Sequence, residues 1–107
     1  MSNRFMRIMV FFDLPVTTKK DRKAATDFRK FLIKDGYYMV QFSVYARVCN
    51  GIDAAEKHMN RLKAAVPDNG SVRAMIVTEK QYESMYVLTG ELHKEEKPFA
   101  YQQMTIF

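Results

Sequence analysis

The opening segment of this chain predicts a β-strand that is apolar on both of its faces. In residues 4–12, one face would carry Met6, Ile8, Val10 and Phe12, and the other would carry Phe5, Arg7, Met9 and Phe11. Towards the end of the segment both faces consist of large apolar side chains, so both have to be covered. Pro15 lacks a backbone N–H and cannot continue a central strand, so the strand ends near Asp13.

A helix is expected between Pro15 and Gly36. Thr17 or Thr18 would cap its first turn, where Asp21 favours the positive end of the helix dipole. Gly36 suits the left-handed conformation that often ends helices. The positions at helical 3–4 spacing, which should face the core, are Ala24, Phe28, Phe31, Leu32 and Asp35.

Residues 37–49 alternate in the pattern of a β-strand. One register of this alternation contains Val40, Phe42, Val44, Ala46 and Val48. The pattern allows either one long strand or two short strands that meet near Gln41–Ser43, and it does not separate the two.

A second helix is expected after Asn50-Gly51. Asp53 and Glu56 have the spacing of a capping box, and Pro67 would end the helix. The positions expected to be buried are Ile52, Ala55, Met59, Leu62 and Val66.

The last third of the chain predicts short β elements. Residues 72–77 read as a strand, and residues 79–81 as a connector to a further β segment at 84–88. The charged residues 91–97 read as a linker, and residues 104–107 as a last short strand.

The order of these elements predicts an α+β fold of the ferredoxin-like type, β-α-β-β-α-β, with an additional C-terminal strand. Residues 1–90 would form the ferredoxin-like domain, and residues 91–107 a C-terminal extension. A chain of 107 residues supports one such domain.

The positive charge of the chain is concentrated in its first half. Residues 1–50 contain ten Lys and Arg against four Asp, whereas residues 51–107 contain seven Lys and Arg against eight acidic residues. The cluster is densest at Lys19, Lys20, Arg22 and Lys23. Such clustering is typical of proteins that bind polyanions, although a solvated helix face explains the same charge run.

Asp13 is the candidate reactive residue, because it is the only charged residue in the run from Ile8 to Pro15. A carboxylate beside so many apolar side chains loses hydration, and it needs a metal ion, a hydrogen-bond donor or an open cleft in return. A simple turn role is the alternative, since Asp and Pro are both common in turns.

The remaining polar candidates are isolated. His58 and His93 are expected at the surface, and Cys49 is expected to be a small buried apolar residue. A single cysteine forms no internal disulfide, which fits a reducing compartment. With no signal peptide and no apolar run near the roughly 20 residues that cross a bilayer, the expected localisation is cytoplasmic, without a membrane partner.

Eight Phe and six Tyr are more aromatic surface than one thin core needs. The sheet face without helices should therefore stack on nucleic-acid bases or pack against another subunit. The Gly-rich signature of RNA-recognition modules is absent from residues 43–47, which favours packing against a second copy.

Four motifs, in order, resemble the CRISPR-associated endoribonuclease family of the smaller adaptation subunit (Cas-two). They are Val10-Phe11-Phe12-Asp13, Gln41-Phe42-Ser43-Val44-Tyr45, Gly70-Ser71-Val72-Arg73 and Thr78-Glu79-Lys80-Gln81. The resemblance covers residues 4–90. The tail after Gly90 looks most like the branch found beside single-effector CRISPR systems.

The resemblance implies a two-fold homodimer packed through its sheets, with the C-terminal strand crossing to the partner. The two Asp13 carboxylates would then lie near the dimer axis and could hold one hydrated Mg²⁺, with Asp13 as catalytic residue and metal ligand. The expected nucleic-acid-binding residues are Lys19, Lys20, Arg22 and Lys23 of the basic cluster, with Arg47 and Arg73 as second candidates, since strand arginines can instead pair with carboxylates in the dimer.

Three functions follow as expectations. The first is a scaffold in spacer acquisition, a dimer that joins two dimers of the larger CRISPR integrase in a heterohexamer and binds foreign duplex DNA. The second is a metal-dependent endonuclease that cuts RNA or DNA through Asp13. The third is a stand-alone, toxin-like RNA interferase. The thin catalytic set favours the scaffold.

Overall fold

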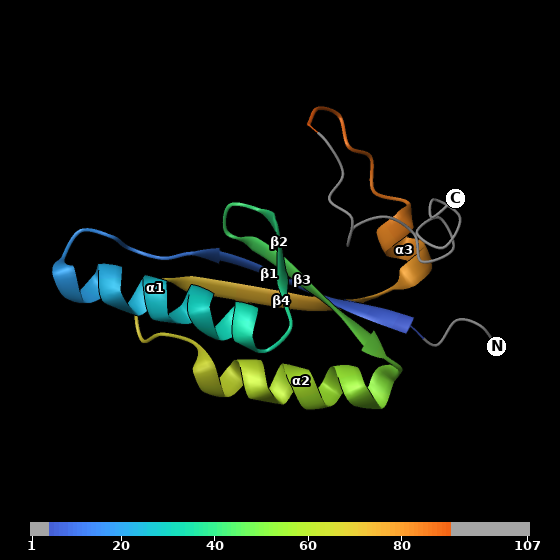
Figure 1. Ribbon diagram of the computed structural model, residues 1–107, viewed down its shortest axis with the longest axis horizontal. Coiled ribbons are helices and arrows are strands. Elements are labelled where there is room, and N and C mark those ends of the chain that lie inside the picture. The colour runs from blue at the N-terminus through green and yellow to red at the C-terminus, as the bar shows by residue number, and fades with distance from the viewer. Residues whose placement is uncertain (1–4, 91–107) are drawn as a thin grey trace.

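The protein folds around a four-stranded antiparallel sheet (Figure 1). The computed structural model describes residues 5–90. The strands are β1 (Phe5–Asp13), β2 (Tyr38–Gln41), β3 (Val44–Asn50) and β4 (Ser71–Thr78), and their order across the sheet is β2-β3-β1-β4. With α1 (Lys19–Lys34) and α2 (Ile52–Ala65) between them, this is the predicted ferredoxin-like order.

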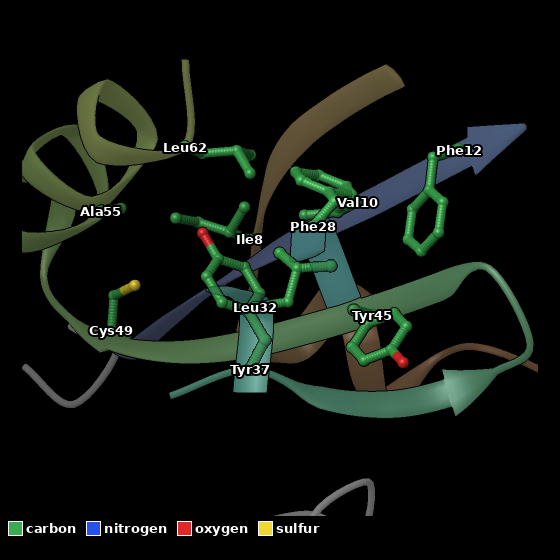
Figure 2. Close-up of a cluster of buried hydrophobic side chains, with 10 residues drawn as sticks. All are labelled: Ile8, Val10, Phe12, Phe28, Leu32, Tyr37, Tyr45, Cys49, Ala55 and Leu62. Carbon is green, nitrogen blue, oxygen red and sulfur yellow. The ribbon is translucent and has the colours of Figure 1, made fainter. Parts of the chain in front are cut away.

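Two helices cover one face of the sheet, and the main core lies between them and the strands (Figures 1 and 2). The ring of Phe28 on α1 meets that of Phe12 on β1 edge to face, with 5.2 Å between ring centroids. Figure 2 shows Ile8 and Val10 of β1 pointing into the same cluster as Leu32. β1 lies in the interior of the sheet, because it pairs with β3 on one side and β4 on the other.

The boundaries of α1 agree with the sequence prediction. Thr18 is its N-cap, and the Thr18 hydroxyl accepts a hydrogen bond of 3.0 Å from the backbone N–H of Asp21. Gly36 follows the helix with a φ of 96°. Ala25, rather than Ala24, is the buried alanine, and it lies with Phe28 and Leu32 on the covered face.

The β2–β3 segment forms two short strands, which decides between the two alternatives left by the pattern. Phe42 and Ser43 make the turn, and Ser43 has a positive φ of 73°. The register shifts between Met39 and Gln41. The turn removes Phe42 from the alternation of residues 37–49, and its side chain is 77% exposed instead of lying in a strand.

The start of α2 differs from its prediction. Gly51 is the N-cap, with a φ of 100°, and no side chain caps the helix, so the predicted capping box is wrong. Ile52 and Val66 are exposed because they stand at the ends of the helix, outside the turns that face the sheet. Ala55 and Leu62, seven residues apart, are the buried positions, and Pro67 follows the end as expected.

The predicted β segment at residues 84–88 is wrong. The predicted connector at 79–81 forms a short helix, α3 (Glu79–Glu83), and residues 85–88 are not in a strand. Thr78 and Gln81 make a reciprocal capping box, and this local pattern favours a helix where tertiary context allows one. The expected linker at 91–97 and strand at 104–107 lie outside the described residues.

α3 covers part of the second sheet face. Its Tyr82 packs with Met9 and Ala46 in a smaller cluster, so both faces of β1 are covered near Met9 but not at Phe11, where the sequence predicted cover. Phe11, towards the end of β1, and Met75, opposite Met9 on β4, stay partly exposed. Among residues 5–90, none of the helices combines the length and the apolar character needed to span a bilayer.

Candidate nucleic-acid interface

Asp13 is the last residue of β1, and it is exposed to solvent. Its backbone is in register with Ser71 of β4. Since side chains alternate along a strand, Asp13 lies on the same sheet face as Phe11 and opposite the helices. An open position, rather than a buried donor, is therefore how this carboxylate keeps its hydration.

Gly70 fixes the path of the chain after Asp13. A Cβ on Gly70 would lie 2.8 Å from the carbonyl oxygen of Asp13 and 2.8 Å from Cδ2 of Leu14, and Gly70 has a φ of 98°. A side chain there would push the two loops apart. The close approach holds the β1–α1 loop against the α2–β4 turn.

The predicted basic cluster occupies the first turns of α1 and is exposed. Together with Lys30 it lines a shallow hollow on the helix surface, formed by Lys19, Lys20, Arg22, Lys23, Thr26 and Asp27. The cluster begins soon after Asp13 in the chain, whereas the Asp13 side chain lies on the sheet face opposite α1.

Arg22 and Lys23 have partners within the chain. The Arg22 guanidinium donates to the carbonyl oxygens of Val16 and Thr17, at 3.1 and 3.2 Å. The Lys23 ammonium lies 2.7 Å from the Asp27 carboxylate, an exposed pair that contributes little to stability. In the described part of the chain, the side chains of Lys19 and Lys20 have no such hydrogen bond or ion pair.

The structure separates Arg47 from Arg73. Arg47 lies on the helix-covered face and donates to the carbonyl oxygens of Asp35, at 2.8 Å, and Val48, at 2.9 Å. The Arg47 guanidinium therefore binds the backbone at the C-terminal end of α1. Arg73 is exposed and lies on the other face, in register with Phe11 and on the side of Asp13.

A polar cluster at the end of α1 was not expected from the sequence. The Asp35 carboxylate is buried, and Arg61 of α2 donates to its Oδ1 from Nε at 2.8 Å and from Nη2 at 2.5 Å. Burial opposes ionisation, but the hydrogen bond and charge of Arg61 outweigh it, so the pKa of Asp35 lies below its usual value. The cluster ties α1 to α2.

His58 belongs to this cluster rather than to the surface. Its Nδ1 lies 3.7 Å from Oδ2 of Asp35, and its side chain is only 16% exposed. Burial and the charge of Arg47 lower the pKa of His58, which keeps the imidazole neutral near pH 7. Cys49 is buried as predicted, and burial raises the pKa of its thiol.

Residues 5–90 contain no group of three or more His, Cys, Asp or Glu side chains that could hold a metal ion. Asp13 offers one exposed carboxylate, and Mg²⁺ is commonly held by one or two carboxylates and several waters. The donor set thus fits a hydrated magnesium ion, held most firmly if a second chain supplies a second carboxylate.

An aromatic and cationic contact at the β2–β3 turn was also missed. The guanidinium carbon of Arg29 lies 3.9 Å from the centroid of the Phe42 ring and 4.9 Å from that of Phe12. Arg29 also donates to the Ser43 hydroxyl at 3.0 Å. The motif around Ser43 marked this turn, but only the fold brings Arg29 to it.

Comparison with known proteins places these features in a family. The family model described as CRISPR associated protein Cas2 matches residues 6–85. A protein named CRISPR-associated endoribonuclease Cas2 from Acidovorax ebreus is 56% identical over 102 residues, covering 95% of this chain and all of that protein. A protein of the same name from Campylobacter jejuni is 43% identical over 98% of this chain and 73% of its own length.

Proposed function

The chain belongs to the CRISPR-associated Cas2 family, and from that membership we propose that it is an adaptation subunit that binds the backbone of foreign duplex DNA during spacer acquisition. It acts as a homodimer that joins two dimers of the larger CRISPR integrase. The observation that carries the proposal is the exposed cationic surface of α1, which begins directly after the Asp13 loop.

Cations on a helix suit this task because they bind phosphates without reading bases. Lys19 and Lys20 point their charges at solvent rather than at a carboxylate of residues 5–90, so they remain available to a polyanion. Arg73 lies on the Asp13 side of the sheet and can extend the path. Arg47, held by the end of α1, is the weakest of the candidates.

The first experiment measures the salt dependence of duplex binding. Replacing Lys19 and Lys20 with Ala should weaken binding to a similar extent for unrelated sequences, and it should flatten the slope of log K against log salt by about one unit for each phosphate that is no longer bound. Lys57→Ala, an exposed lysine on α2, is the matched control. A sequence-selective loss, or an unchanged slope, would argue against the proposal.

A homodimer is the second element of the proposal. Phe11 of β1 and Met75 of β4 are diagonal neighbours on the face opposite α1 and α2, and their side chains are 38% and 50% exposed. A second copy packed on this face would cover them. It would also bring a second Asp13 carboxylate near the first.

Sedimentation at low micromolar concentration should therefore give about twice the 12.5 kDa mass of one chain. Met75→Asp should shift the equilibrium towards single chains, because it places a charge in the proposed contact. Ile33→Asp, at an exposed apolar position on α1, should leave the mass unchanged. A single-chain mass for the wild type would remove the basis for joining the two carboxylates.

Metal-dependent cleavage of RNA or DNA at Asp13 is the second candidate function. It is favoured by the exposed carboxylate beside a cationic surface and by the names of the relatives, which are endoribonucleases. A bound Mg²⁺ would supply a more acidic water and shield phosphodiester charge. Asp13 would hold the ion, and the α1 cations would orient the strand.

A further inference from the structure

We propose that the β2–β3 turn binds an unpaired nucleobase, stacked on the ring of Phe42. The site takes a single-stranded segment of nucleic acid, which includes an overhang at the end of a duplex. The inference rests on the proposed function, because the cations of α1 would bind the phosphates that flank the stacked base.

The Phe42 ring is exposed and yet held in place. Phe42 is 77% exposed at the tip of the turn. Exposing such a large apolar side chain to water is unfavourable in free energy. The Arg29 guanidinium supports it at 3.9 Å and also contacts the buried ring of Phe12. A supported ring loses little conformational freedom when a base stacks on it.

The backbone of the turn is anchored beside Asp13. The N–H of Phe12 donates to the carbonyl oxygen of Ser43 at 3.0 Å, and the Ser43 hydroxyl accepts from Arg29 at 3.0 Å. The turn therefore lies against the residue that precedes Asp13. A base stacked on Phe42 would bring its strand to the same end of the sheet as that carboxylate (Figure 1).

The charge around Phe42 selects a polyanion over an apolar protein surface. Arg22 and Arg29 are two helical turns apart on one side of α1, about 10 Å along its axis. Lys30 is exposed next to Arg29, and the nearby Asp27 carboxylate is paired with Lys23. An exposed aromatic ring next to a row of cations is the combination by which proteins bind single strands.

The test compares two ligands of the same sequence, a 20-nucleotide single strand and its blunt duplex, by fluorescence anisotropy in EDTA. Phe42→Ala should weaken single-strand binding about 10- to 100-fold and change duplex binding less than twofold. Phe42→Tyr should retain single-strand binding, because it keeps the ring. Ile52→Ala removes an exposed apolar side chain at the other end of the sheet, and it should affect neither ligand.

A single strand that contains 2-aminopurine reports the stacking directly. Its fluorescence should fall on binding to the wild type and to Phe42→Tyr, but not to Phe42→Ala at saturation. The inference would be overturned if Phe42→Ala lost equal affinity for the single strand and the duplex. It would also be overturned if the fluorescence were still quenched in Phe42→Ala. A change in the sedimentation mass of Phe42→Ala would also overturn it, because the ring would then contact a second copy.

The same titrations separate this inference from the proposed function. If replacing Lys19 and Lys20 weakens both ligands while Phe42→Ala weakens neither, backbone binding is supported and base stacking is rejected. If Phe42→Ala weakens only the single strand, at an unchanged salt slope, while the lysine substitutions change nothing, stacking is supported and the role of α1 in the proposed function is rejected.

Discussion

Replacing Glu79 with Ala is expected to lower the free energy of unfolding by about 2–4 kcal/mol. Glu79 forms a two-point ion pair with Arg7, with 2.7 Å between Oε1 and Nε and 2.8 Å between Oε2 and Nη2. The Arg7 side chain is 2% exposed, so removing the carboxylate leaves a buried charge without its anion.

The rest of the Arg7 environment limits this loss. Its guanidinium also donates to the Tyr38 hydroxyl and lies 4.2 Å from the centroid of the Tyr82 ring. Burial disfavours the charged form of Arg7, but the hydrogen bonds and charge interactions with Glu79 and Tyr38 together outweigh it, so the pKa of Arg7 is raised. When the pair is broken, α3 can leave the sheet and let water reach Arg7, which keeps the cost below that of a fully enclosed pair.

Urea unfolding followed by circular dichroism measures the effect, at one protein concentration because association would add to stability. Glu83→Ala, at an exposed position on α3, is the matched control and should change stability by less than about 0.5 kcal/mol. In Glu79→Ala, the amide hydrogens of α3 should exchange faster than in the wild type. This increase should be larger than any increase in β1. Equal losses in the two variants would show that α3 contributes through its helix and not through the ion pair.

Asp13→Ala is expected to reduce any Mg²⁺-dependent cleavage of nucleic acid to the level measured in EDTA. The reason is that Asp13 supplies the exposed carboxylate of the proposed metal site. Folding and the proposed dimer should survive, because the side chain faces solvent and, in that dimer, its removal would relieve repulsion between two like charges. Spacer integration should also survive if the protein acts as a scaffold.

The measurement is paired: cleavage and integration are followed in one buffer for the wild type, Asp13→Ala and Asp13→Asn. Asp53→Ala removes an exposed carboxylate from α2 and should change neither activity. Loss of integration with a normal dimer and normal integrase binding would show that the Asp13 site is used in acquisition itself, and the scaffold proposal would then have to be abandoned. Cleavage that persists without the carboxylate would reject Asp13 as the metal ligand.

Local chemistry made much of the fold predictable. Thr18 caps α1 and Gly36 follows its end as expected, because a hydroxyl at the N-cap and a residue free to adopt positive φ act within one turn of the chain. The two-faced strand β1 also followed from its pattern, because apolar side chains on both faces require a central position. The exposed basic cluster of α1 was likewise visible as a charge run outside the apolar stripe.

The errors and open alternatives arose where a local sequence pattern was compatible with two structures. Residues 84–88 have strand-forming side chains, but a strand needs a hydrogen-bonded neighbour, and within residues 5–90 no strand pairs with them. In the residues just before them, the side chains of Thr78 and Gln81 accept hydrogen bonds from each other's backbone N–H groups. This capping box starts α3, where the sequence predicted a connector. The pattern of residues 37–49 left one long strand and two short strands open, because a turn at Ser43 carries no Gly to mark it.

By itself, then, the sequence determined the order of the elements, the central place of β1, the position of Asp13 at its end and the exposure of the α1 cations. These depend on alternation, helical spacing and caps, which act over a few residues. Tertiary structure alone decided that Arg7 pairs with Glu79, that Asp35 pairs with Arg61, and that Arg29 supports Phe42. Each of these contacts joins separate elements of the fold, and no local pattern records which partners packing will bring within hydrogen-bond distance.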